Sequence, residues 1–204
     1  MNTVTNNSVN LQSLSDEDVM EQLQAGNMHA FDILVSRFKD RLHNFLFRYT
    51  HNHEDCEDLV QETFLRVFKS RQSYTRIAKL STWIYTIALN LAKSMYKKKQ
   101  RMSTVSMHAD PSDPDDFEIA IEDTTILQDE QLHQKICVEQ LEKALHTLND
   151  DFKEAIILRD IQQLTYEEIS EITGSAMGTV KSRINRGRIQ LQEILEEYSL
   201  QETF

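Results

Sequence analysis

Turn-forming residues are scarce in this chain, and their scarcity is the strongest constraint on its fold. The 204 residues include only 4 glycines and 2 prolines, and both prolines, Pro111 and Pro114, lie in one short segment. A many-stranded β protein needs many more such residues between its strands. The sequence therefore predicts an all-α fold.

Apolar residues recur three and four positions apart along the first half of the chain, which is the helical period. We expect a first helix that begins at Ser15 and ends at Gly26, a second over 31–49 and a third over 55–69. A fourth helix follows, with Ser81 as its N-cap. The period returns at residue 132, so a second set of helices is predicted near the C-terminus.

The segment between the two helical sets has the composition of a tether. Residues 102–134 hold nine acids and no cation, and both prolines lie there. The sequence therefore predicts two small helical domains, over 15–101 and 132–199, joined by an acidic flexible linker over 102–131. Residues 1–14 are polar and are predicted to form a disordered tail.

Charge is strongly segregated along the chain, whose formal net charge is -11. Residues 63–101, called the acid-free block below, hold ten cations and no acid. A basic block of this size within an acidic protein indicates contact with a polyanion such as nucleic acid.

Several classes of protein are disfavoured by the same composition. The start of the chain has no apolar signal segment, and no apolar run approaches the length of a membrane span. Cys56 and Cys137 have no pairing pattern, which is typical of reduced cytoplasmic thiols. His51, His53 and Cys56 lie close in sequence, but a polar turn is a better interpretation than a metal site because a further ligand is missing. We expect no metal, no cofactor, no phosphate-binding glycine loop and no catalysis.

A helix-turn-helix pattern occupies the C-terminal part of the chain. Thr165 and Glu168 form a capping box, Gly174 supplies a turn, and Ser175 is a candidate cap for the next helix. The segment Gly178–Arg188 carries four cations and no acid, as expected for a DNA-reading helix. A solvated basic helix is the alternative interpretation. The candidate DNA-contacting residues are Thr179, Lys181, Ser182, Arg183, Arg186 and Arg188.

Three segments in order, 58–68, 81–90 and 178–183, resemble the extracytoplasmic-function (ECF) sigma factors of the bacterial sigma-70 family. The resemblance covers roughly residues 16–101 and 132–198. Four positions depart from the family pattern: Cys56, Ala176, Asn185 and Gly187. The last three bear on the DNA sequence that would be preferred rather than on how DNA would be bound.

The resemblance implies that the first domain is sigma region 2. Its third helix would bind the coiled coil of the largest subunit of core RNA polymerase through Asp55, Asp58, Gln61, Glu62 and Arg66. The loop over 70–80 and the fourth helix would open and read the promoter -10 element. The residues assigned to this role, where cations meet phosphates and polar or aromatic groups meet unpaired bases, are Arg71, Tyr74, Arg76, Lys79, Tyr85, Asn90, Lys93 and Lys97.

The resemblance further implies that the second domain is sigma region 4, with the helix-turn-helix over about 165–185 reading the -35 element. Region 4 would also contact the flap of the second large polymerase subunit, and an anti-sigma factor is an implied partner. Two alternatives remain at this point: a stand-alone helix-turn-helix regulator, and a scaffold or anti-sigma-like protein. A separate hypothesis is that the acidic linker lies over the basic faces of the free protein and weakens its DNA binding.

Overall fold

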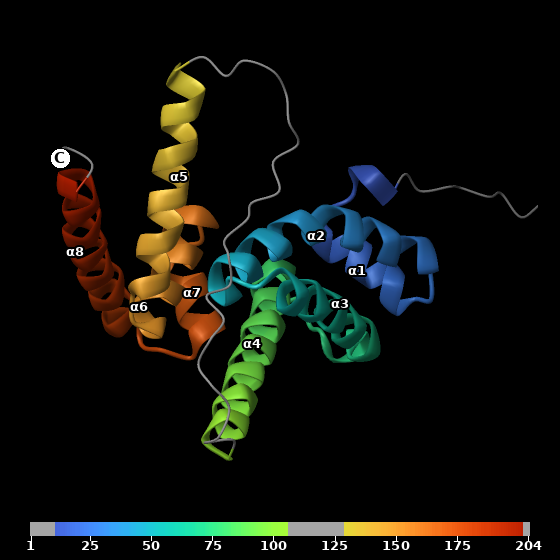
Figure 1. Cartoon of the computed structure of the whole chain (residues 1–204). Helices are drawn as coiled ribbons and strands as arrows, with labels where there is room; N and C mark the ends of the chain where they lie inside the picture. Colours follow the sequence, from blue (N-terminus) through green and yellow to red (C-terminus); the bar gives the residue numbers. More distant parts are fainter. Residues whose placement is uncertain (1–10, 106–128, 202–204) are drawn as a thin grey trace, which may run out of the picture.

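The computed structural model describes residues 11–105 and 129–201, and every regular element in these two stretches is helical (Figure 1). The N-terminal unit holds α1 (Asp16–Gln24), α2 (Met28–Thr50), α3 (His53–Lys69) and α4 (Leu80–Val105), with short 3-10 turns η1 (Leu11–Ser13) and η2 (Arg71–Ser73). The C-terminal unit holds α5 (Asp129–Thr147), α6 (Asp150–Ile156), the π-turn η3 (Ile157–Ile161), α7 (Tyr166–Thr173) and α8 (Met177–Gln201). The all-α prediction is confirmed for the described residues.

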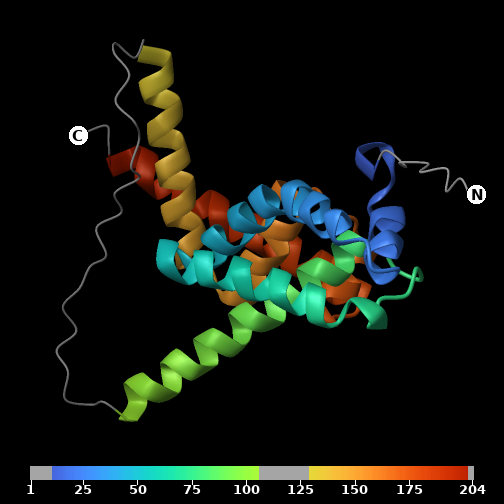
Figure 2. The same cartoon turned by 90° about the vertical axis from the view of Figure 1, so that its right-hand side faces the viewer.

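Helical structure extends into both ends of the segment predicted as a linker. Helix α4 continues to Val105 and α5 begins at Asp129, so both ends of the predicted 102–131 segment are helical. Residues 106–128, and with them the hypothesis of an acidic cover, lie outside the described residues. The projecting ends of α4 and α5 are visible in both views (Figures 1 and 2).

Several helix starts follow the local sequence. Ser15, where the sequence predicted the first helix to begin, caps α1, and its hydroxyl accepts from the Asp18 N–H at 3.2 Å. Asn27 caps α2 and Asn52 caps α3 in the same way. These bonds span two or three residues and satisfy backbone donors that have no partner inside the helix.

The predicted cap at Ser81 is wrong, because α4 already begins at Leu80. The Leu80 N–H donates to Glu17 Oε1 of α1 at 3.1 Å, so a carboxylate from a distant helix satisfies this donor.

The tail prediction also differs from the structure near its end. The Arg37 guanidinium donates to the carbonyls of Leu14 and Gln12, which holds η1 against α2. Residues 1–10 lie outside the described part of the chain.

Helix α2 is the central helix of the N-terminal unit. Its buried face packs against α1, α3 and α4, with Phe38, Leu42, Phe45 and Leu46 almost fully enclosed. In the C-terminal unit, α8 packs against α5, α6 and α7. Among the residues described, none of the helices combines the length and apolar character that a bilayer crossing requires.

The two units pack directly on one another, a feature that the linker composition did not predict. Helix α4 contacts α7, and α2 contacts both η3 and α5. A single buried cluster contains the core of the N-terminal unit together with side chains of the C-terminal unit, namely Ala155, Ile157, Leu158, Leu164, Ile169, Ile172, Val180 and Ile184. The prediction of two helical units is confirmed, and the units share a core.

Helix α8 passes α6 at Gly187, where the backbones come close. A Cβ atom at this position would lie 2.7 Å from Ile156 Cδ1 and 3.1 Å from Phe152 Cβ. We expect Gly187→Leu to lower the free energy of unfolding by about 1–3 kcal/mol, because the larger side chain forces the two helices apart. Thermal unfolding followed by circular dichroism measures the change.

Gly178→Leu is the matched control, since it makes the same substitution on the same helix. No atom lies within 4 Å of a Cβ built at Gly178, so this variant should unfold at or above the wild-type temperature. Equal melting temperatures for the two variants would contradict the packing explanation.

Candidate nucleic-acid interface

The C-terminal unit contains the predicted helix-turn-helix. The capping box is confirmed: Thr165 Oγ1 accepts from the Glu168 N–H, and the Glu168 carboxylate accepts from the Thr165 N–H at 2.7 Å. Gly174 ends α7 in the left-handed conformation, with φ 66°, which favours glycine. This turn directs the chain into α8.

Helix α8 begins at Met177, so Ser175 is not its N-cap. The Ser175 hydroxyl instead accepts from the Arg183 guanidinium at 2.9 Å. Val180 and Ile184 face the core and are almost fully buried. The opposite face of α8 is therefore open to solvent: it presents the predicted residues Thr179, Ser182 and Arg186, and Lys181 lies exposed on its flank.

The two remaining arginines predicted on α8 have acidic partners within the C-terminal unit. Arg183 pairs with Asp151 at 2.6 Å, and Arg188 Nε donates to Asp160 Oδ2 at 3.0 Å. These contacts hold α8 against α6 and η3. Sequence analysis did not identify Asp151 and Asp160 as partners, because 32 and 28 residues separate the paired groups.

The loop between α3 and α4 belongs to the acid-free block and is held against α1. Gln24 Nε2 donates to the carbonyls of Arg71 and Tyr74, and Arg76 pairs with Asp18 at 2.8 Å. Tyr74 is buried, and its hydroxyl donates to the Ala78 carbonyl. Ile77, by contrast, is 94% exposed. The loop is thus fixed at its base, with an apolar side chain at its outer end that sequence analysis missed.

The remaining residues assigned to the -10 element are Lys79, directly before α4, and Tyr85, Asn90, Lys93 and Lys97 on α4. Asn90 and Lys97 are exposed to solvent. Three other groups contact the C-terminal unit instead: Lys79 pairs with Glu168, Lys93 pairs with Glu154, and Tyr85 donates to Gln162. The structure therefore brings only part of the predicted -10 set to the surface.

Helix α3 presents a polar face, defined as Asp55, Asp58, Gln61, Glu62 and Arg66. Asp58 and Gln61 are exposed, Arg66 pairs with Glu62 at 3.0 Å, and Asp55 pairs with Lys99 of α4. Leu65 lies on the same side, one turn beyond Gln61, and is 44% exposed. Single exposed apolar side chains are common on protein surfaces, so Leu65 adds apolar area to this face without identifying what binds there. Its position off the apolar stripe of α3 is the signal that would have identified it.

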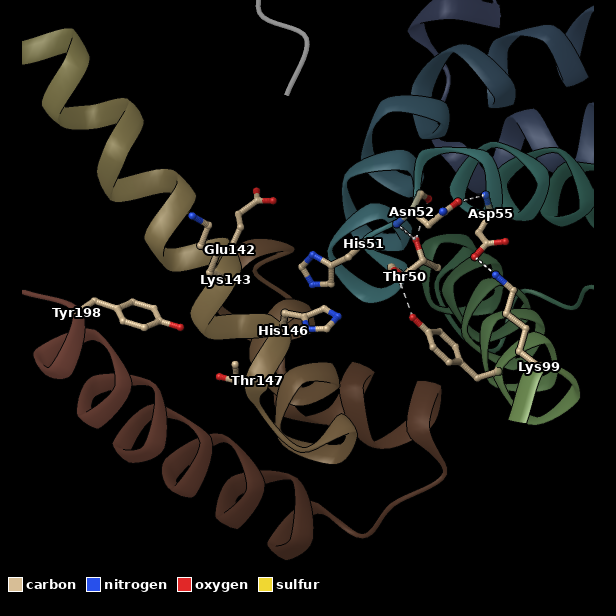
Figure 3. A pocket seen from close by; sticks show the side chains of 11 residues that line it. Thr50, His51, Asn52, Asp55, Lys99, Glu142, Lys143, His146, Thr147 and Tyr198 are labelled. Carbon is tan, nitrogen blue, oxygen red and sulfur yellow. Dashed lines mark hydrogen bonds and ion pairs between the residues drawn. The ribbon is translucent and has the colours of Figure 1, made fainter. Parts of the chain in front are cut away.

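A cavity of about 640 Å³ lies where the turn between α2 and α3 meets α4, α5 and α8, and Figure 3 shows its lining from close by. The His51 and His146 rings meet edge to face, with centroids 4.6 Å apart. Glu142 Oε1 pairs with Arg48 at 3.3 Å, whereas its buried Oε2 and the buried His51 Nε2 have no hydrogen-bond partner. This cavity lies at the joint between the units.

The possible metal ligands near this joint do not converge. Cys56 Sγ contacts the His43 carbonyl, and burial raises the pKa of the Cys56 thiol to about 12, which disfavours the thiolate that binds metal. The His53 ring packs on Phe47 with centroids 4.4 Å apart. Within residues 11–105 and 129–201, no group of three or more His, Cys, Asp and Glu side chains has the arrangement of a metal site.

Acidic pH is expected to weaken the joint between the units. Burial lowers the pKa of His51 from 6.5 to about 4, and His146, Lys153 and Arg48 add to this shift. The folded-state pKa is below the unfolded value, so the stabilisation by neutral His51 is complete above pH 6.5 and is lost as the pH falls towards 4. Between about pH 7.5 and about pH 5.5, the contribution of His51 should lower the free energy of unfolding by at most about 1 kcal/mol. The effect is limited because the ring is partly open to water.

His51→Asn isolates this effect. His51 has a left-handed backbone, with φ 52°, which Asn tolerates, and the amide does not titrate. Burial raises the pKa of Glu154, which acts in the opposite sense but is present in both proteins. The wild-type protein should therefore lose more stability than the variant in urea titrations at the two pH values. Parallel pH profiles would exclude a role for His51.

Comparison with known proteins matches both units. The model of sigma-70 region 2 matches residues 34–102, and that of sigma-70 region 4 matches residues 138–191. The ECF RNA polymerase sigma factor SigE of Mycolicibacterium smegmatis is 37% identical over 172 residues, which are 84% of this chain and 64% of that relative. The ECF RNA polymerase sigma-E factor of Haemophilus influenzae is 32% identical over 190 residues, which are 91% of this chain and 97% of that relative.

Solved structures agree with these matches. The sigma factor RpoE of Bartonella quintana, in complex with the anti-sigma factor NepR, has a TM-score of 0.66 at 29% identity and covers 81% of this chain and 96% of its own. CnrH, in complex with the cytosolic domain of CnrY, has the same TM-score at 20% identity over 89% of this chain and 97% of its own, and so shares the fold. Because both helical units match in order and over most of their length, the chain belongs to the ECF sigma factors of the sigma-70 family.

Proposed function

We propose that the protein is a transcription initiation subunit that binds core RNA polymerase and directs it to promoters. The α3 polar face binds the coiled coil of the largest polymerase subunit. The loop before α4, with α4 itself, opens and reads the -10 element, and the outer face of α8 reads the -35 element while the C-terminal unit contacts the flap. The protein contributes binding and DNA opening rather than catalysis, and acts in the cytoplasm, where promoter DNA lies.

One observation carries this proposal: two surfaces suited to nucleic acid lie on two separate helical units of one chain. The first is the acid-free block, with exposed Asn90 and Lys97. The second is the exposed face of α8, with Lys181 and Arg186. Cations bind the phosphate backbone, and arginine in a major groove can pair with guanine edges. A stand-alone regulator would need only the second surface.

The decisive experiment mixes the full-length protein with core polymerase that lacks any sigma factor. Gel filtration at low salt should show co-elution, and transcription on genomic DNA should then start at defined sites. Sequencing the RNA 5′ ends would return the -35 and -10 sequences. A protein that binds DNA but never co-elutes with polymerase would support the stand-alone regulator instead.

An anti-sigma factor is a further proposed partner. The relative from Bartonella quintana was solved in complex with one, and that complex supports the same class of partner for this chain. Copurification of the tagged protein from its native cells, followed by mass spectrometry, tests this partner independently of promoter activity.

A further inference from the structure

Helix α1 packs beside the α3–α4 loop (residues 70–79), which the proposed function assigns to the -10 element. It contacts η2 within this loop and α4 directly after it (Figure 2). The region 2 match begins at residue 34, so α1 lies before the matched segment and has none of the roles proposed above. The loop has little regular structure of its own, since η2 is its one helical turn. Contacts from outside are therefore needed to hold it in one conformation.

Gln24, the half-buried last residue of α1, holds the start of the loop. Its Nε2 donates to the Arg71 carbonyl at 2.7 Å and to the Tyr74 carbonyl at 2.9 Å. A side-chain amide has two N–H donors, and here each of them has a backbone acceptor. In the opposite direction, Gln72 Nε2 donates to the Gln24 carbonyl at 2.9 Å. One side chain of α1 thus fixes the backbone near both ends of η2.

Acidic groups of α1 hold the rest of the loop. Arg76 pairs with Asp18 at 2.8 Å and with Glu21 at 3.3 Å. At the far end, Glu17 Oε1 accepts from the Leu80 N–H at 3.1 Å. Helix α1 therefore contacts the loop at its start, in its middle and where it enters α4.

These contacts leave the outer end of the loop open to solvent. Thr75 is exposed and Ile77 is 94% exposed. Tyr74, by contrast, is buried, donates to the Ala78 carbonyl and packs on the Trp83 ring. A loop that is ordered before DNA arrives does not lose this conformational freedom on binding. Helix α1 thus determines the conformation in which the outer end of the loop would meet a DNA strand.

We propose that Gln24 is a positioning residue for the -10 element, which acts through the loop and does not contact DNA itself. This inference rests on the proposed function. The effect of Gln24 falls on the choice between base sequences, because a base edge is recognised only by groups held in fixed positions. General attraction to phosphates depends on cations that a displaced loop still carries.

Gln24→Leu tests the proposal, because it removes both donors without changing the charge. Gln22→Leu is the matched control: it makes the same substitution on α1, and the two side chains point about 200° apart around the helix. Hydrogen exchange of the full-length protein measures the order of the loop directly. The Ser73 and Tyr74 N–H groups donate within the loop, so their exchange reports on its opening. A peptide over residues 71–79 should exchange at least about fivefold faster in Gln24→Leu, and at the wild-type rate in Gln22→Leu.

Reading of the -10 element is measured with the holoenzyme, formed from core polymerase and the full-length protein. The probes are labelled single strands of about 12 nucleotides that carry the -10 sequence obtained from the RNA 5′ ends, or a scrambled version of it. Gln24→Leu should bind the -10 strand about tenfold more weakly than the wild type, which corresponds to about 1.4 kcal/mol. Its affinity for the scrambled strand should change by no more than about twofold. Affinity for core polymerase should be unchanged, which separates this effect from a general folding defect.

Glu17→Ala is a second variant that removes the acceptor at the far end of the loop, and circular dichroism confirms that each variant is folded. It should also reduce the preference for the -10 strand, and it keeps the inference testable if Gln24→Leu does not fold. The inference is overturned if the loop of the variants exchanges at the wild-type rate, or if it exchanges faster and the preference for the -10 strand is retained. Failure of the proposed function would appear in the wild type: its holoenzyme would not distinguish the two strands, whatever the exchange rates of the loop.

Discussion

Asp58→Lys is expected to weaken binding to core RNA polymerase by at least about 100-fold, about 2.7 kcal/mol. Asp58 is exposed near the middle of the α3 polar face, between Asp55 and Gln61. A charge reversal at this position places a cation where the partner surface has been matched to an anion, and such a like-charge contact costs several kcal/mol. The protein should remain folded, because Asp58 is at the surface.

Fluorescence anisotropy of the labelled protein, titrated with sigma-free core polymerase, measures the change. Glu57→Lys is the matched control, since it makes the same charge reversal at the adjacent exposed position. Glu57 points about 100° away from Asp58 around the helix and lies one turn before Gln61, so it stands at the edge of the polar face rather than near its middle. The assignment of α3 fails if Glu57→Lys is as harmful as Asp58→Lys, or if Asp58→Lys still binds like the wild type.

The exposed Leu65 adds apolar area to the same surface. It lies one turn from Gln61 and is 44% exposed, whereas Leu59 and Phe64 of the same helix are buried. A partner that covers the α3 polar face would also cover this side chain, and burying its apolar area would add to the free energy of binding.

Local features of the fold were predictable from the sequence because their partners lie within four residues. The helix start at Ser15 and the capping box between Thr165 and Glu168 are of this kind, and both are confirmed. The spacing of apolar side chains three and four positions apart is equally local, so the sequence predicted the all-α fold and the order of its helices. The helical period likewise explains the burial of Val180 and Ile184, which are four residues apart and so lie on one face of α8.

Long-range partners were not predictable in this way. The Glu17 carboxylate accepts from the Leu80 N–H at the start of α4, although 63 residues separate the two. Gln162 accepts from the Tyr85 hydroxyl across 77 residues. No spacing rule connects residues that far apart, so Ser81 was wrongly expected to cap α4, and Tyr85 was expected to meet DNA without any sign of its intramolecular partner. Its role in DNA binding stays a prediction.

The second large effect is expected at the -35 element, where Arg186→Ala should lower holoenzyme affinity by about 5- to 150-fold, or about 1–3 kcal/mol. Arg186 is exposed on the face of α8 that also carries Thr179 and Ser182. A guanidinium placed in a major groove can donate two hydrogen bonds to one guanine, and alanine removes both. Affinity is measured by anisotropy on duplexes that carry the -35 sequence obtained from the RNA 5′ ends, or a scrambled version of it.

Arg188→Ala is the matched control on the same helix. Its guanidinium is held by Asp160, so it is less available to DNA, and its loss should change affinity by no more than about threefold. If Arg186 reads a base, its loss should weaken binding to the -35 duplex much more than to the scrambled one. An equal loss on both duplexes, with a salt slope lower by about 0.9, would instead assign Arg186 to a phosphate and contradict base recognition at this position.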